Sequence, residues 1–337
     1  MAFPGRKIFD KVRQTDLFES LKHSATYFSA NVATQAVAFI SIPIFTRILT
    51  EAEYGIIEVF KSYMFIGATV FSLNSFASVS RYYFEKNDDF PKFIGSNLTL
   101  VLITFLFSAT ILLIFQDKLA ELMQLPGDLI FYLILASFFT VILRIFQQVV
   151  VPQKRSKDEL KVSILRAVTL LALSVVLITS LETDKYLGQI WAVLIVGFII
   201  SVYIFYLIKD DLRLSFDIRH FKYILNYSVP LLPYHISALI LAQFSRLMIN
   251  SSSGSAEAGL FSFAFNIGMI LSIVNISTNK AILPDFFDFL DKGEHKRLDQ
   301  LIRKMFSVVL FAALGLVLFA KEIVTIMADE KFHIALP

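Results

Sequence analysis

The strongest constraint in this sequence is a series of nine apolar stretches, each about as long as a membrane is thick. A bilayer core of about 30 Å is crossed by about 20 apolar residues in a helix. Two stretches, 93–115 and 186–208, hold no charged residue, and 167–181 and 305–320 are the charge-free cores of two more. The others carry one or a few polar groups and cover 24–49, 56–83, 128–151, 221–249 and 257–284. The sequence therefore predicts an all-α polytopic membrane protein.

Composition excludes a water-soluble globule and most enzyme chemistry. Hydrophobic residues make up 56% of the 337 residues and charged residues 18%, whereas a soluble domain is roughly a quarter charged. The chain has no cysteine, no Gly-rich phosphate loop and no His-Glu-x-x-His motif. We therefore expect no cofactor, no metal site and no catalytic residue. The net charge of +3 is too small to indicate a nucleic-acid partner.

Lys and Arg are unevenly distributed between the segments that connect the spans. Counted alternately from the N-terminus, one set of segments holds 21 of them and the intervening set only four. Positively charged segments tend to stay in the cytoplasm, so this ratio predicts a cytoplasmic N-terminus. Residues 1–21 mix four cations with apolar residues and predict a basic amphipathic arm on the membrane face, with a solvated arm as the alternative.

The first and later spans contain similar segments at a nearly constant separation. Residues 45–49 (FTRIL) match 244–248 (FSRLM) at an offset of 199, and an offset of 204 then pairs Gly55 with Gly259. A repeat of six spans is even, so both copies enter the membrane in the same direction. The sequence therefore predicts two six-helix lobes related by a pseudo-twofold axis along the membrane normal.

This repeat also sets the expected domains. We expect the arm over 1–21, a first lobe with spans one to six over 22–209, and an incomplete second lobe over 210–337 with spans seven to nine and the start of a tenth. The partners of spans four to six would fall beyond residue 337, which predicts a second lobe truncated after about three helices. A natural nine-span protein is the alternative.

The first span and the segment after it carry a family resemblance. A helix with residues 27–29 (YFS) and Pro43 leads into 47–55 (RILTEAEYG), which resembles the start of the Wzx-type O-antigen flippases. These belong to the superfamily of multidrug and oligosaccharidyl-lipid exporters. The resemblance implies two lobes around a central cavity in a bacterial cytoplasmic membrane. It also implies movement of an undecaprenyl-pyrophosphate-linked oligosaccharide for lipopolysaccharide synthesis, with the polysaccharide polymerase and chain-length machinery as partners.

Four cations within the spans are candidates for binding a pyrophosphate: Arg47, Lys61, Arg246 and Lys280. A charge at the bilayer centre costs about 2.5–3.5 kcal/mol, so such a group normally faces a cavity or a partner. Arg binds phosphate oxygens bidentately, and Lys acts as a point charge. We expect the repeat-related Arg47 and Arg246 to hold the diphosphate from opposite sides of one cleft. The alternative is that each extends to the headgroups and fixes its helix there.

Polar side chains within the spans are further candidates. We expect Asn31, Gln35 and Asn74 to line a cavity wetted by sugar, although interhelical hydrogen bonds explain them equally well. Glu58 and His235 are candidates for proton coupling. Their alternatives are an ion pair of Glu58 with Lys61 one turn later and simple packing of His235. The amides of Gln243, Asn266, Asn275 and Asn279 belong to the same polar class.

Two other functions remain open from the sequence. A cation-coupled multidrug exporter of the same superfamily would use buried carboxylates to bind its substrate, and Glu58 is the one such residue in the first lobe. A membrane polymerase or ligase for lipid-linked sugars also needs basic residues near pyrophosphate. Such an enzyme would present a large outer loop, and here the longest outer segment between complete spans is 116–127, with 12 residues.

Overall fold

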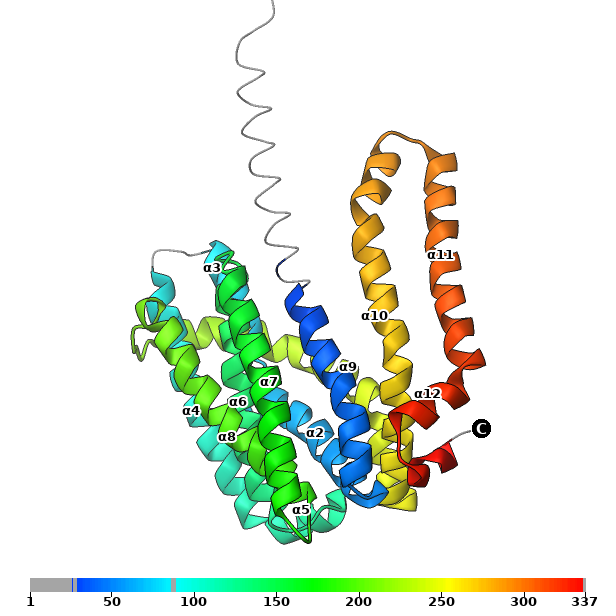
Figure 1. Cartoon of the computed structure of the whole chain (residues 1–337). Helices are drawn as coiled ribbons and strands as arrows, with labels where there is room; N and C mark the ends of the chain where they lie inside the picture. Colours follow the sequence, from blue (N-terminus) through cyan, green and yellow to red (C-terminus); the bar gives the residue numbers. More distant parts are fainter. Residues whose placement is uncertain (1–25, 27–28, 86–88, 336–337) are drawn as a thin grey trace, which may run out of the picture.

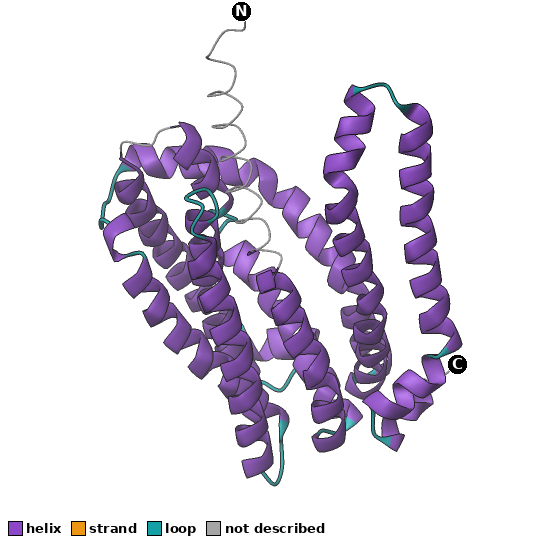
Figure 2. Cartoon of the chain, turned by 45° about the horizontal axis from the view of Figure 1, so that its top comes forward, coloured by secondary structure: helices purple, strands orange, loops and turns teal. Residues whose placement is uncertain are grey.

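The fold is helical throughout the part of the chain that the computed structural model describes, which is residue 26 and the ranges 29–85 and 89–335 (Figure 2). Nine helices in this part are long and apolar enough to cross a membrane, and no strand occurs in it. The prediction of an all-α polytopic membrane protein is confirmed. The predicted arm over 1–21 lies outside the described residues.

The helices follow one another with short connections. The first span is Ser29–Ile48. The following long helices are α2 (Glu51–Phe71), α4 (Phe90–Ile114), α6 (Leu129–Val150), α7 (Ser156–Ser180), α8 (Tyr186–Leu207), α9 (Ile218–Ser253), α10 (Ser255–Asp291) and α11 (His295–Leu318). The shorter helices are α3 (Ala77–Glu85), α5 (Gln116–Met123) and α12 (Ala320–Met327), with 3-10 turns at Lys209–Asp211 and Glu330–Ala335.

The second predicted span needs correction, because residues 56–83 do not form one helix. Helix α2 begins earlier, at Glu51, where the Thr50 side chain accepts the Glu53 backbone N–H and the Glu53 carboxylate accepts that of Thr50. It ends at Phe71. Leu73 (φ 49°) and Asn74 (φ 57°) then adopt left-handed conformations that a right-handed helix cannot contain, so the chain turns before α3.

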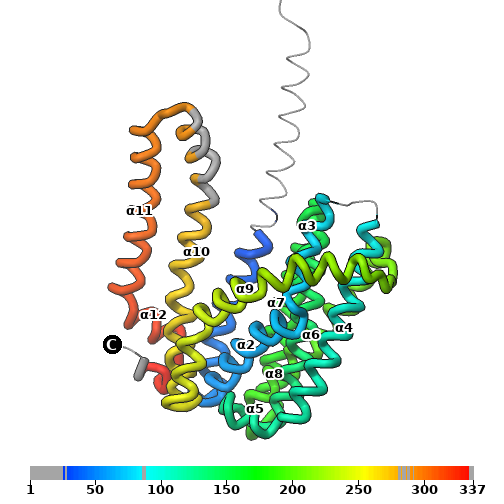
Figure 3. Tube along the Cα trace, turned by 180° about the vertical axis from the view of Figure 1, so that it is seen from behind, coloured from blue at the N-terminus to red at the C-terminus, as the bar shows by residue number. Residues whose placement is uncertain are grey.

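Two groups of helices converge at one end of the molecule and diverge at the other (Figures 1 and 3). Helices α3, α4, α6, α7 and α8 form one group, and α10 and α11 belong to the other. At the converging end α2 crosses α10 so closely that a Cβ on Gly55 would overlap the Ser255 carbonyl oxygen. A Cβ on Gly259 would likewise overlap the Glu51 carbonyl oxygen. The two glycines let the backbones touch.

Further contacts join the groups at this end. Thr46 Oγ donates to the Met327 carbonyl oxygen (3.1 Å), and Gln124 donates to the Ser251 carbonyl oxygen (3.0 Å). The Tyr54 ring meets Phe332 edge to face, with centroids 5.7 Å apart. The converging end is therefore packed and hydrogen-bonded.

Helix α9 links the two groups. Its first turns bury Phe221 and Ile224 in the core formed by α3, α4, α6 and α8, and its later part packs against α2 and α10. Figure 3 shows α9 changing direction along its length. Pro230 and Pro233 lie inside it, where each removes one helical hydrogen bond and favours a bend.

Candidate substrate-binding site

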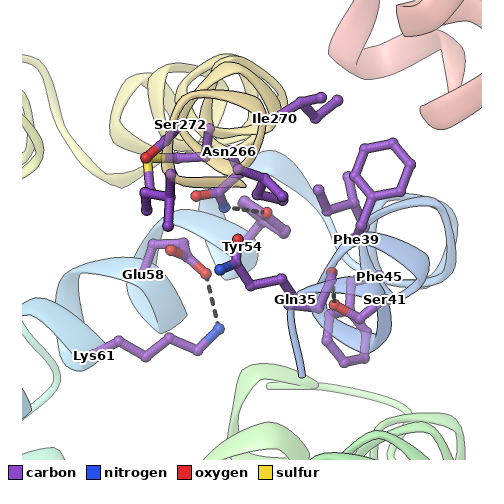
Figure 4. Close-up of a pocket in the computed structure, with 15 residues that line it drawn as sticks. Gln35, Phe39, Ser41, Phe45, Tyr54, Glu58, Lys61, Asn266, Ile270 and Ser272 are labelled. Atoms are coloured by element: carbon purple, nitrogen blue, oxygen red, sulfur yellow. Dashed lines mark hydrogen bonds and ion pairs between the residues drawn. The ribbon is translucent and has the colours of Figure 1, made fainter. Parts of the chain in front are cut away.

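A cavity of about 370 Å³ lies between the first span, α2 and α10 (Figure 4). Most of its wall is apolar, including Phe39, Phe45 and Ile270. Its polar wall comes from Gln35, Ser41, Tyr54, Glu58, Lys61, Asn266 and Ser272. A few polar groups in an apolar cavity are typical of a ligand site.

Glu58 is the centre of the charged groups in this cavity. It is only 7% exposed. Lys61 lies one turn later on the same face of α2, and its Nζ donates to Glu58 Oε1 at 2.8 Å. Arg246 of α9 places Nη2 4.0 Å from Glu58 Oε2. The buried carboxylate is therefore neutralised by cations from two helices, as a charge within a span requires.

Arg246 is fixed by neighbours on α9 and α10. Its Nη1 donates to Gln243 Oε1 (3.0 Å) and its Nη2 to Asn266 Oδ1 (2.9 Å). Asn266 in turn donates to the Tyr54 hydroxyl (3.0 Å), and the guanidinium lies over the Phe265 ring at 4.8 Å. The buried Nε–H of Arg246 has no hydrogen-bond partner among the described residues.

The charges of this site sum to a net positive value. Two cations, Lys61 and Arg246, surround one carboxylate, Glu58, so one positive charge is uncompensated. A cavity with this balance favours an anion. Lys61 is the more exposed cation, with 30% of its side chain accessible against 11% for Arg246.

The structure brings only part of the predicted set together. Lys61, Gln35 and Glu58 line the cavity, and Arg246 contacts Glu58. Arg47 is exposed and donates to the Ile326 carbonyl oxygen of α12 at 3.4 Å.

The remaining predicted residues lie apart from the cavity or outside the description. Asn31 is exposed on the first span, and Asn74 is fully buried in the turn between α2 and α3. His235 is half-buried on α9 with its ring edge to face with that of Tyr234. The side chain of Lys280 lies outside the described part of the chain.

Sequence reasoning missed Tyr54 and Ser62. Tyr54 lies one turn before Glu58 on the same face of α2 and contacts Asn266. Ser62 donates to Gln243 Oε1 at 2.8 Å across the α2–α9 contact. The i, i+4 spacing of Tyr54, Glu58 and Ser62 was a usable signal, because such residues share one helix face.

Solved structures with the same arrangement are transporters. A MOP-superfamily transporter from Pyrococcus furiosus superposes with a TM-score of 0.62 at 15% identity, over 94% of this chain and 75% of that one. A Vibrio cholerae MATE transporter gives 0.62 at 12% identity, over 93% and 76%. An outward-facing multidrug resistance MATE family transporter gives 0.61 at 14%, over 94% and 75%. The chain therefore has the fold of a MOP-superfamily transporter.

The chain belongs to the polysaccharide biosynthesis protein family, whose model matches residues 20–290. Protein 1 of the Lsg locus of Haemophilus influenzae is 24% identical over 306 residues, which cover 88% of this chain and 73% of that protein. An uncharacterized membrane protein of the same organism is 22% identical over 284 residues, with coverage of 83% and 68%. Family and fold together indicate a multi-pass membrane transporter.

Proposed function

We propose that the protein moves a polyprenyl-pyrophosphate-linked oligosaccharide across the cytoplasmic membrane, as the resemblance to O-antigen flippases implies. The observation that carries this proposal is the uncompensated positive charge of a cluster in which Glu58 and Lys61 line the cavity and Arg246 contacts Glu58 behind them. A diphosphate needs cationic partners where water is scarce, and both kinds of cation are present.

The same cluster suggests how binding and movement are connected. In this structure the Glu58 carboxylate pairs with Lys61 and lies 4.0 Å from Arg246. A diphosphate that reaches Lys61 and Arg246 competes with Glu58 for them, which weakens the link between α2 and α9. The loop charges predict that the diverging end faces the cytoplasm. Substrate would therefore enter from the cytoplasmic side and leave after the converging end opens, by alternating access.

A cation-coupled multidrug exporter is the second candidate, and one observation favours it. Glu58 is a buried carboxylate next to a cavity, in a fold shared with MATE transporters. A cationic drug would have to displace Lys61 from Glu58. Proton coupling through Glu58 or His235 is compatible with either function and stays a prediction.

Deletion of the gene in its own bacterium tests the proposal. We expect undecaprenyl-linked sugar units to accumulate on the inner leaflet and surface polysaccharide to be lost. Complementation with Lys61→Met should fail, whereas the exposed Lys118→Met should restore export as a matched control, with both proteins at equal membrane abundance. Normal polysaccharide with new sensitivity to cationic dyes would establish the exporter instead. Single repeat units left on the outer surface would indicate a polymerase or ligase.

A further inference from the structure

Lys61 also lines a second cavity, which lies between the first span, α2, α7 and α8. It has a volume of about 290 Å³. Most of its wall is aliphatic or aromatic. Its polar wall consists of Thr34, Ser41, Lys61, Arg166, Ser174 and Gln189. The hydroxyls of Thr34 and Ser41 already donate to backbone carbonyls of their own helix.

Arg166 has no partner in the part of the chain that the structure describes. Its side chain makes no hydrogen bond, ion pair or ring contact there. It lines this cavity from α7 and also borders a smaller one between α2, α6, α7 and α8. Arg144 provides the contrast within the same helix group. Its Nη1 donates to Thr69 Oγ (2.8 Å), and its guanidinium lies over the Phe76 ring at 5.1 Å. A cation within a span that lacks a protein partner calls for another counter-charge.

The far end of the cavity holds two more unpartnered polar groups. Ser174 is fully buried and Gln189 is 3% exposed. Neither Ser174 Oγ nor Gln189 Oε1 has a hydrogen-bond partner among the described residues. Buried polar atoms are nearly always satisfied, by water if not by protein. A volume of about 290 Å³ holds several waters at roughly 30 Å³ each. These groups therefore favour an aqueous occupant over an acyl chain.

The charge count selects the kind of ligand. Lys61 also lines this cavity, but its ammonium is paired with Glu58 at 2.8 Å. One positive charge, that of Arg166, is left uncompensated. We infer that this cavity is a binding site for a small monovalent inorganic anion such as chloride, held by Arg166 and accompanied by water on Ser174 and Gln189. This site goes beyond the proposed transport function and does not depend on it.

Lys61 connects the anion site to the cavity between the first span, α2 and α10, because it lines both cavities. An anion near Arg166 attracts the ammonium of Lys61 away from Glu58. Removing the Glu58 charge therefore frees Lys61 for the anion. Glu58→Gln should therefore tighten anion binding. Coupling between two sites is reciprocal. The factor by which a bound anion changes the affinity of the cavity between the first span, α2 and α10 for its ligand equals the factor by which that ligand changes the affinity for the anion.

Equilibrium binding of radioactive chloride to the purified full-length protein in detergent tests the site. The buffer contains gluconate at constant ionic strength. We expect saturable binding that unlabelled chloride and nitrate displace. Arg166→Gln should weaken it about tenfold or more, since it removes a charge-assisted hydrogen bond. Arg144→Gln is the matched control and should bind as the wild type does. Ala167→Leu fills the cavity with Arg166 intact and should also weaken binding.

Each other outcome overturns the inference. No saturable binding by the wild type would exclude the site. Equal binding by wild type and Arg166→Gln, or equal loss in Arg144→Gln, would show that chloride binds elsewhere. If Arg166→Gln fails to fold, Ala167→Leu decides, and its unchanged affinity would exclude the cavity. Stronger displacement by inorganic phosphate than by chloride would refute the monovalent assignment. None of these measurements depends on whether the substrate is a lipid-linked sugar.

Discussion

The close crossing of α2 and α10 predicts that a single methyl group can open the converging end. In Gly259→Ala the added Cβ would overlap the Glu51 carbonyl oxygen and lie 3.0 Å from its carbon. In Gly55→Ala it would overlap the Ser255 carbonyl oxygen and lie 2.9 Å from the Gly259 nitrogen. Ordinary Cβ contacts begin at 3.4 Å. The obstacles are backbone atoms, so the helices themselves must separate.

The expected cost follows from this overlap. Overpacking a close contact costs about 1–3 kcal/mol. The substitution also gains up to about 1 kcal/mol of helix propensity, because Gly is a poor helix former. Gly268 on the same helix is the matched control, since a Cβ there would meet nothing within 4 Å. Gly268→Ala should gain the same helix propensity without any overlap with another helix. The two variants should therefore differ by about 1–3 kcal/mol in the stability of the converging end.

Thiol labelling measures that difference. The chain has no cysteine, so Thr46→Cys gives a single reporter at a fully buried position that contacts Met327 across the two helix groups. A free-energy change of 1–3 kcal/mol corresponds to an increase of roughly 5- to 150-fold in the opened fraction. Maleimide labelling should accelerate by that factor in Gly259→Ala and Gly55→Ala but not in Gly268→Ala. Equal rates in Gly259→Ala and Gly268→Ala would refute the view that this crossing holds the end shut.

Three further predictions concern charged residues. At the diverging end the Tyr82 hydroxyl donates to Asp89 (2.6 Å) and lowers the pKa of that carboxyl, and His220 Nε2 at 3.0 Å acts in the same direction. A carboxyl whose pKa is lowered on folding stabilises the fold at pH values above its ordinary pKa of 3.8. This stabilisation is lost as the pH falls further. The Tm difference between wild type and Asp89→Asn should therefore be positive at pH 7 and shrink as pH falls below about 4. Arg246→Lys should reduce surface polysaccharide, whereas Arg47→Lys should not. The Arg246 guanidinium donates to two side-chain amide oxygens in a geometry that Lys cannot reproduce, whereas Arg47 makes one exposed contact. A larger loss of polysaccharide in Arg47→Lys than in Arg246→Lys would contradict this. Finally, Lys157→Cys should react with impermeant maleimide from the cytoplasmic side alone, and labelling from outside would refute the orientation.

The number of spans could be predicted from sequence because lipid offers the backbone no hydrogen-bond partners. Every polar backbone group must be bonded within the segment, so an apolar stretch of sufficient length has to be a helix. The boundaries depend on finer signals. The capping residues Thr50 and Glu53 set the start of α2, and the left-handed Leu73 and Asn74 end it before α3. Hydropathy detects neither the capping residues nor the left-handed turn, so the sequence predicted one span over residues 56–83.

The site was predictable where it depends on one helix and not where it depends on packing. Glu58 and Lys61 are three residues apart, and their ion pair follows from helix geometry. The pairing of Arg246 with Asn266 requires α9 and α10 to lie side by side. The predicted repeat relates Arg47 to Arg246 in sequence, but helix rotation decides which way each side chain points, and sequence offsets do not specify it.

The crossing of α2 and α10 has the reciprocity that the predicted repeat implies. Gly55 meets Ser255 and Gly259 meets Glu51, and residues 51 and 255 are separated by the same 204 positions as the two glycines. Such reciprocity is what a local twofold axis produces. Glu58 follows Gly55 by one helical turn, and its partner Arg246 belongs to the helix that leads into α10. We therefore expect a motion that separates Gly55 from Gly259 to disturb the Glu58–Arg246 pair as well. If so, opening the converging end and exposing the cation of the site are one movement, as the proposed transport of an anionic substrate would require.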